Sequence, residues 1–200
     1  VDTRENRVTP LTDLEGNLSG LSVAANVVAI VESSLDKPGT LLAGLHESGL
    51  EPGQIDVAII NAGVKEESTL PDMIKVLRRV FDVNVFGAME TASALLPAFQ
   101  RRGQGHLIFI SSQGRWHGMP VSGSYNASKA ALSVLVESLA MDLGEAGRKA
   151  VRVTSVEPGL ICTGMAGEGR LQKLLSVDAA TAARRILRSA AGRRSLCRFP

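Results

Sequence analysis

Short apolar runs alternate along most of the chain with longer segments whose apolar residues recur at helical spacing. Runs of a few residues that are rich in β-branched side chains predict buried strands. Five strands are expected: Asn26–Glu32, Ile55–Ile60, His106–Ile110, Val151–Val156 and, at an edge, Ser195–Phe199. The unbroken apolarity of Ile55–Ile60 indicates burial on both faces of a sheet.

The segments between these runs predict helices. They are Leu11–Leu21, Lys37–Gly49, Pro71–Arg101 in one or two pieces, Ser122–Gly147, Leu171–Leu175 and Val177–Ala191. Strands that alternate with helices favour an α/β fold with a parallel sheet and right-handed crossovers.

Composition narrows the class of protein. The chain has 200 residues, which suits a single domain (1–200) with a substantial core, and 44% of them are hydrophobic and 21% charged. A net charge of +2 gives no case for binding nucleic acid or an anionic membrane. No apolar run reaches the length of a membrane span.

The two cysteines, Cys162 and Cys197, lack the spacing of metal ligands, so no metal site is expected. Reduced thiols are the default in the cytosol, and we therefore expect a cytoplasmic protein. The first residues, VDTRENR, are charged and lack the apolar core of a signal peptide. They also do not begin with Met, which suggests a processed or partial chain.

Candidate chemistry begins with Tyr125 and Lys129, which lie four residues apart in a predicted helix. Residues at this spacing share a helix face, so the ammonium would lie beside the phenol. A cation within about 4–6 Å favours the phenolate and lowers a phenol pKa that is ordinarily about 10. The pair is therefore either a tuned general acid/base or a solvated helical pair.

Other motifs surround this pair. Ser112 follows the strand His106–Ile110 and lies thirteen residues before Tyr125. It would emerge at the carboxyl edge of the sheet, which is where ligands bind in open α/β sheets. Further along that edge we expect Asn61-Ala62-Gly63 after one strand and Pro158-Gly159 with Thr163 after another, while Asn84 lies within DVNVFG.

In order and spacing these motifs resemble those of the short-chain dehydrogenase/reductase family: NAG, an isolated Asn, Ser thirteen residues before Tyr, YxxxK and PGxxxT. The resemblance covers residues 27–200. It implies a Rossmann-like, doubly wound parallel sheet with helices on both faces. It also implies NAD or NADP as cofactor and a small-molecule alcohol or ketone as substrate.

The resemblance implies catalytic roles for Asn84, Ser112, Tyr125 and Lys129. Tyr125 would exchange a proton with the substrate oxygen, and Lys129 would lower the pKa of Tyr125 and bond the nicotinamide ribose. Ser112 would hydrogen-bond the substrate oxygen, and Asn84 would support a water that leads the proton out. The structural alternatives are a turn cap for Ser112 and a backbone-bonding amide for Asn84.

The same resemblance implies a cofactor site made of Asn61, Ala62, Gly63, Tyr125, Lys129, Pro158, Gly159, Ile161 and Thr163. Gly63 would allow close approach of the backbone, and residues 158–163 would flank the nicotinamide. Plain turns are the structural alternative. Trp116 and Met119, between Ser112 and Tyr125, form either an apolar substrate wall or ordinary loop packing.

One family feature is not found in the sequence. The family opens with a strand, a Thr-Gly-x-x-x-Gly-x-Gly turn that holds pyrophosphate, and a helix. We therefore expect an N-terminally incomplete domain in which the buried edge of Ile55–Ile60 would lack its usual neighbour. Unpaired backbone groups there are costly. We predict either a gap beside this strand or pairing with Asn26–Glu32.

Two hypotheses for the function follow. The first is an NAD(P)-dependent oxidoreductase that interconverts a secondary alcohol and a ketone by hydride transfer, with Tyr125 as general acid/base. The second is a truncated, non-catalytic relative that binds dinucleotide poorly and acts, if at all, through oligomerisation. The resemblance implies a homodimer or homotetramer through Pro71–Arg101 and Ser122–Gly147. The second of these helices carries small and apolar residues that support it: Ala130, Ala131, Val134, Leu135 and Ser138.

Overall fold

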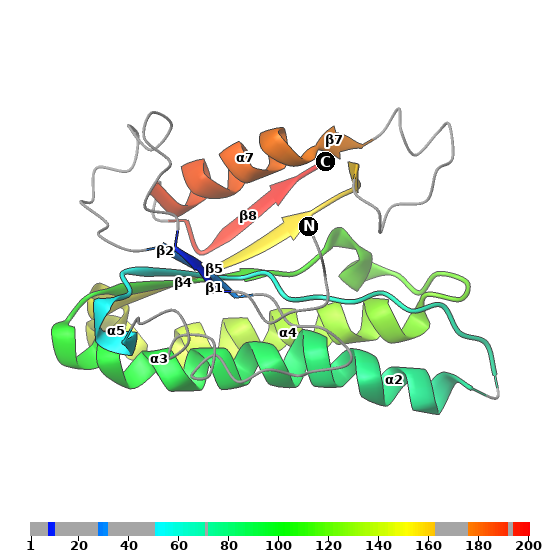
Figure 1. Ribbon diagram of the computed structural model, residues 1–200, viewed down its shortest axis with the longest axis horizontal. Coiled ribbons are helices and arrows are strands. Elements are labelled where there is room, and N and C mark those ends of the chain that lie inside the picture. Colours follow the sequence, from blue (N-terminus) through cyan, green and yellow to red (C-terminus); the bar gives the residue numbers. More distant parts are fainter. Residues whose placement is uncertain (1–7, 11–27, 32–50, 71, 163–175, 192–193) are drawn as a thin grey trace.

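The computed structural model describes residues 8–10, 28–31, 51–70, 72–162, 176–191 and 194–200. The predicted helices Leu11–Leu21, Lys37–Gly49 and Leu171–Leu175, and the predicted site residue Thr163, lie outside these residues. The described elements form one main sheet with helices on both of its faces (Figure 1).

Six strands form this sheet in the order β1-β2-β3-β4-β5-β8. They are β1 (Val8–Pro10), β2 (Val28–Val31), β3 (Val57–Ile60), β4 (Gly105–Ile110), β5 (Val151–Pro158) and β8 (Leu196–Phe199). Neighbouring strands are parallel except β1, which runs antiparallel to β2. The predicted parallel α/β sheet is confirmed, and β1 is an addition that the polar N-terminal pattern did not predict.

The edge of β3 that was expected to lack its usual neighbour is covered by β2. These two strands pair in parallel, with Val28 opposite Val57 and Val31 opposite Ile60. This confirms the second of the two predicted outcomes. Every residue of β3 is buried, also as predicted. Its backbone groups can be satisfied on both sides, because β2 and β4 flank it.

The helices on one face differ from the prediction mainly where they break. The predicted helix Pro71–Arg101 consists of α2 (Met73–Phe81), a π-helical segment η2 (Asp82–Gly87) and α3 (Ala88–Arg102). The predicted helix Ser122–Gly147 is divided into α4 (Gly123–Asp142) and α5 (Gly144–Ala150). Gly144 has a φ of +60°, a left-handed conformation that glycine adopts readily and that ends α4.

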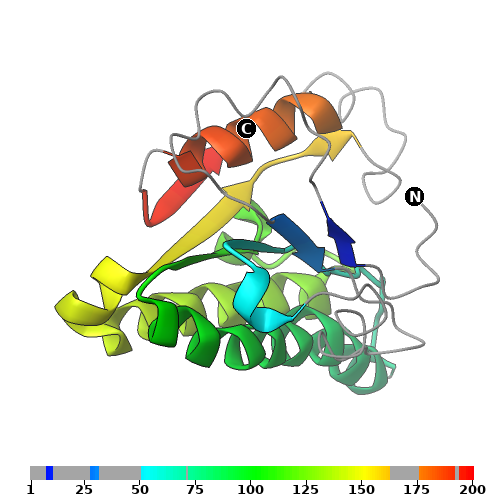
Figure 2. The same cartoon turned by 60° about the vertical axis from the view of Figure 1, so that its left-hand side comes forward.

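The other face is covered by α7 (Ala179–Ala191), as the two views in Figures 1 and 2 show. This helix begins two residues later than predicted, because Val177–Asp178 forms the short strand β7, paired with β6 (Ile161–Cys162). Two 3₁₀ turns complete the described elements: η1 (Pro52–Gln54) and η3 (Gln113–Trp116). None of the helices in the described ranges is long and apolar enough to cross a membrane.

Alternate residues of the central strands supply two cores. Ala58, Ile60, Leu107 and Phe109 face α3 and α4, where they pack with Leu95, Phe99, Leu132 and Val136. The residues between them, Val57, Ile59 and Ile108, face α7 and pack with Ala182 and Phe199. The apolar sequence of these strands is unbroken because both of their faces are buried. The doubly wound arrangement that was predicted is confirmed.

His106 is the polar exception among the buried residues of β4, and only 1% of it is exposed. Its Nε2 lies 2.8 Å from Thr154 Oγ1, and this hydroxyl donates its own proton to Arg194 O at 2.7 Å. The ring must therefore donate from Nε2, which fixes the tautomer of the neutral ring. Burial, with a smaller contribution from the positive charge of Arg152, lowers the pKa of His106 from 6.5 to about 3.

We expect His106 to make the fold sensitive to acid. The pKa of His106 is lower in the folded than in the unfolded state, so between pH 6.5 and about 3 the unfolded state binds the proton first. The free energy of unfolding should decrease as the pH is lowered through this window, by up to about 1.4 kcal/mol per pH unit. Urea titrations at several pH values measure this slope.

The substitution His106→Gln should flatten that slope, whatever it does to the stability at neutral pH. The matched control is His117→Gln, because His117 is exposed and makes no buried contact of this kind. An equally steep slope in His106→Gln would contradict the assignment.

Candidate active site

The carboxyl ends of β3, β4 and β5 meet at one edge of the sheet because these strands are parallel. Asn61–Gly63 follows β3, Ser111 and Ser112 follow β4, and Pro158 ends β5. The first turns of α4 contact this edge, so Tyr125 and Lys129 are brought beside the Ser112 turn. Segments far apart in sequence therefore converge where a ligand site was expected.

Ser112 is both a turn cap and a partner of Tyr125. Its Oγ accepts a hydrogen bond from the N–H of Gly114 at 3.0 Å and thereby caps η3. Its side chain also interacts with the Tyr125 phenol and lowers the pKa of Tyr125. The structural alternative for Ser112 is thus present together with the contact that a catalytic role requires.

Tyr125 is the third residue of α4, and its phenol is mostly buried. Burial raises the pKa of Tyr125 because it disfavours the phenolate, while the hydrogen bond with Ser112 lowers it. The expected direction, a pKa lowered by Lys129, is therefore wrong for the site as it stands. The hydrogen bond with Ser112 is what opposes the effect of burial.

The Lys129 ammonium is almost fully enclosed, with 3% of the residue exposed. Its Nζ donates to Ile110 O at 2.8 Å and lies 5.9 Å from the centre of the Tyr125 ring. Burial lowers the pKa of Lys129 from 10.5 to about 8. The predicted four-residue pair is brought together, but the cation is buried rather than solvated.

Asn84 lies in the π-helical segment η2 and is fully buried. Its Oδ1 accepts from the N–H of Val64 at 2.7 Å, and its Nδ2 donates to Val64 O at 3.0 Å and to Ser128 Oγ at 2.9 Å. The Asn84 amide thus forms hydrogen bonds with backbone groups, as the structural alternative to a catalytic role predicted. These groups belong to the loop after β3 and not to the helix of Asn84. Asn84 holds that loop against α4.

Gly63 is the point where the NAG segment touches the Tyr125 and Lys129 region. A Cβ at Gly63 would lie 3.1 Å from Lys129 Nζ and 3.7 Å from Asn84 Oδ1. Because Gly63 has no side chain, the Lys129 ammonium can lie beside it without a close contact. Ala62 is buried and Asn61 is exposed at the edge of the sheet.

The segment that follows β5 is held by the end of the chain. Gly159 donates its N–H to Phe199 O at 2.8 Å, and a Cβ at Gly159 would lie 3.1 Å from Pro200. Pro158 is buried, and Ile161 packs in the core under α7. Their described contacts are thus with β8 and the core, and not with Tyr125 or Lys129.

Several polar residues around the site were missed because single buried serines and amides carry no motif. Ser111 Oγ donates to Lys129 O at 3.0 Å and lies 2.7 Å from Ser133 Oγ. Asn126 Nδ2 donates to His117 O at 2.6 Å, which ties α4 to the loop after Ser112. The available signal was the run of small polar residues on the buried face of a long helix: Ser124, Asn126, Ser128 and Ser133.

Trp116 and Met119 border the same region and are 51% and 49% exposed. The guanidinium carbons of Arg115 and Arg198 lie 4.1 and 4.8 Å from the Trp116 ring centre. The indole is therefore held by two cations while half of its surface stays open. The structure is compatible with either of the two interpretations of these side chains.

Residues 23–174 match the short chain dehydrogenase family, and the chain belongs to it. Dehydrogenase/reductase SDR family member 7B of Mus musculus is 34% identical over 177 residues, which are 88% of this chain and 51% of that protein. Retinol dehydrogenase 8 of Bos taurus is 35% identical over 64% of this chain and 39% of its own length. The chain thus spans about half the length of the curated relatives it matches.

Solved structures agree on the fold. A 7α-hydroxysteroid dehydrogenase complexed with NADH and 7-oxo glycochenodeoxycholic acid superposes with a TM-score of 0.71 at 24% identity, over 83% of this chain and 70% of that one. A short chain dehydrogenase from Burkholderia cenocepacia J2315, in complex with NADP, has a TM-score of 0.67 at 25% identity, over 80% and 66%. The Rossmann-like class expected from the sequence is confirmed.

We expect that removing the buried charge of Lys129 stabilises the fold. The folded-state pKa of about 8 lies below the ordinary 10.5, so the cost of burying the cation is present in full below pH 8 and disappears as the pH rises through 10.5. Lys129→Met should raise the free energy of unfolding at pH 7 by about 1–3 kcal/mol.

This advantage should shrink above pH 8, which urea titrations at pH 7 and at pH 10 will measure. Lys75→Met is the matched control, because Lys75 is exposed on α2 and its loss should change stability by less than about 0.5 kcal/mol. A destabilised Lys129→Met would show that the ammonium is a structural group.

Proposed function

We propose that this chain carries the reaction site of an NAD(P)-dependent oxidoreductase that interconverts a secondary alcohol and a ketone. The observation that carries the proposal is the convergence of the Tyr125 phenol, the Ser112 side chain that lowers its pKa, and the buried Lys129 ammonium 5.9 Å from the Tyr125 ring centre. Among the described residues this cation bonds a backbone carbonyl and pairs with no carboxylate, an arrangement that costs stability and that a chemical role would explain. Membership of the short chain dehydrogenase family supports the same reaction class.

The residues at the edge of the sheet fit a nicotinamide cofactor. An ammonium has three N–H donors, and among the described residues Ile110 O takes one of those of Lys129. Donors remain for a ribose hydroxyl, and Gly63 leaves the space beside them open. We assign Asn61, Ala62, Gly63, Pro158, Gly159 and Ile161 to the walls of this site, and Thr163 to the carboxamide.

NAD or NADP, when bound, supplies or accepts the hydride. In ketone reduction Tyr125 donates its proton to the substrate oxygen, and in alcohol oxidation it accepts that proton. Ser112 holds the same oxygen and stabilises the charge that develops on it. Lys129 offers its remaining N–H donors to the ribose, and Asn84 holds the loop after β3, where we expect a water to take up the proton.

Substitution of Tyr125 tests the chemistry. Tyr125→Phe should lower the rate of NAD(P)H-dependent ketone reduction by about 10²–10⁴-fold, because general acid catalysis is worth that much. The measurement is nicotinamide absorbance over a panel of ketones, with Ser138→Ala as a control on the exposed side of α4. Full activity in a folded Tyr125→Phe would overturn the assignment.

The second hypothesis concerns these 200 residues by themselves: with no Thr-Gly-x-x-x-Gly-x-Gly segment among them, they would bind dinucleotide poorly. Charge-assisted bonds to pyrophosphate contribute about 1.5–3 kcal/mol each, so the loss of two weakens binding by roughly a hundred-fold or more. Titration of the 200-residue chain with NADH and NADPH distinguishes the two hypotheses. Micromolar affinity favours the enzyme, and binding too weak to measure favours the second hypothesis.

We also propose a cytoplasmic homodimer or homotetramer. Apolar side chains stay exposed on the helical layer formed by α2, η2 and α4: Ile74 (61%), Phe86 (56%), Val134 (58%) and Leu135 (39%). A second copy that covers them would bury this surface. Both cysteines are free, as in a reducing compartment.

Val134→Glu should therefore convert the oligomer to a monomer, because it would place a charge in a buried interface. Light scattering measures the mass, and Ala127→Glu, at an exposed position near the start of α4, is the control. A monomeric unsubstituted chain at high concentration would contradict the proposal.

A further inference from the structure

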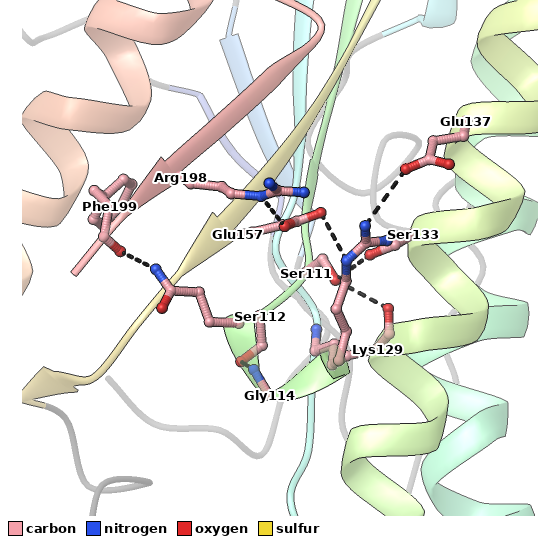
Figure 3. A network of polar contacts seen from close by, with 11 residues as sticks. Ser111, Ser112, Gly114, Lys129, Ser133, Glu137, Glu157, Arg198 and Phe199 are labelled. Atoms are coloured by element: carbon pink, nitrogen blue, oxygen red, sulfur yellow. Dashed lines mark hydrogen bonds and ion pairs between the residues drawn. The ribbon is translucent and has the colours of Figure 1, made fainter. Parts of the chain in front are cut away.

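A fully buried carboxylate lies at the end of β5, directly before Pro158. Glu157 has no exposed surface, and its Oε2 accepts from Arg198 Nε of β8 at 2.7 Å. Its Oε1 lies 3.0 Å from Arg115 Nε of η3. Figure 3 shows the Glu157 carboxylate beside the Arg198 side chain. One anion thus joins β5, β8 and the turn that begins at Ser112.

Arg115 transmits this contact to the backbone of Ser112. The N–H of Arg115 donates to Ser112 O at 3.2 Å, within the turn that Ser112 caps. Gln113 adds a second tie, because its Nε2 donates to Phe199 O at 2.9 Å. The Ser112 turn is therefore anchored to the C-terminal strand at two places, one charged and one neutral.

A buried ion pair of this kind adds little net stability over apolar packing, because desolvation offsets the attraction. What it supplies is a fixed place for the Arg115 side chain: Arg115 Nε lies near Glu157 Oε1 as an ion pair without hydrogen-bond geometry, and Arg115 Nη2 lies 3.6 Å from Glu137 Oε1. The element held in this way is the turn that carries Ser112.

We propose that Glu157 is a positioning residue: through Arg115 it fixes the Ser112 turn and so aims the Ser112 hydroxyl at the Tyr125 phenol. That the orientation of the Ser112 hydroxyl matters for catalysis rests on the proposed function. That Glu157 sets this orientation does not rest on it, and can be tested without measuring enzyme activity. The contact of Glu157 with the two arginines could not be predicted from the sequence, because Arg115, Glu157 and Arg198 are far apart along the chain.

The chain offers an unusually direct probe, because Tyr125 is its single tyrosine and Trp116 its single tryptophan. The titration of the tyrosine ring carbon, followed by NMR with ¹³C-labelled tyrosine, therefore reports the pKa of Tyr125 alone. The emission of Trp116 reports movement of η3. The charged group that faces Tyr125 is Lys129, and it is left unchanged throughout.

Glu157→Gln separates positioning from direct electrostatics by sign. Removal of a negative charge by itself stabilises the phenolate and lowers the pKa of Tyr125. Displacement of Ser112 removes a bond that lowers this pKa, and so raises it. In Glu157→Gln we expect the pKa of Tyr125 to rise toward the pKa that Tyr125 has in Ser112→Ala. The double variant Glu157→Gln/Ser112→Ala should show no further rise, and the emission of Trp116 should change in Glu157→Gln.

Glu157→Asp is the second variant, because it keeps the charge but is one methylene too short to hold both arginines. It should raise the pKa of Tyr125 as well. Asp56→Asn is the control: it weakens the ion pair with Arg102 at the opposite end of β3, and should leave both signals unchanged.

A lowered or unchanged pKa in folded Glu157→Gln and Glu157→Asp would overturn the proposal and leave Glu157 as a structural brace. Failure of both variants to fold, judged by circular dichroism, would lead to the same conclusion. A raised pKa together with full activity of Tyr125→Phe would instead uphold the positioning and refute the proposed chemistry.

Discussion

The structure depends on how a buried ammonium is accommodated at the edge of the sheet. Lys129 Nζ bonds the backbone oxygen of Ile110, while Ser111 Oγ bonds the backbone oxygen of Lys129. These two bonds join α4 to the end of β4 in both directions. Gly63 lies close to this ammonium, since a Cβ there would be 3.1 Å from Lys129 Nζ and one of the two would have to shift by a few tenths of an ångström.

The π-helical segment η2 also joins α4 to the sheet, through Asn84. A continuous α-helix would turn Asn84 differently, whereas the wider π turn lets its amide meet both backbone groups of Val64 and the hydroxyl of Ser128. One side chain thereby connects η2, the loop after β3 and α4. Such segments are frequent at functional sites because they reorient a single residue without ending the helix.

The sheet and its layers were predictable because they follow from periodicity. Continuous apolar runs such as Ile55–Ile60 indicate strands covered on both faces, and the helices between them are long enough to be recognised. The details that failed depend on single residues: the break of the long helix at Gly144, the strand β7 before α7, and the short edge strand β1 around Pro10. None of these alters the local pattern strongly enough to be recognised.

For the site, the sequence by itself determined the chemical groups and their order: the Tyr125 and Lys129 spacing, Ser112 after a strand, and the NAG and Pro-Gly segments. Tertiary structure alone decided their environment. Burial raises the pKa of Tyr125, and the bond with Ser112, rather than Lys129, opposes it. The convergence of Arg115, Glu157 and Arg198 was likewise invisible along the chain. Desolvation and charge pairing depend on which distant elements pack together, and local spacing carries no record of that packing.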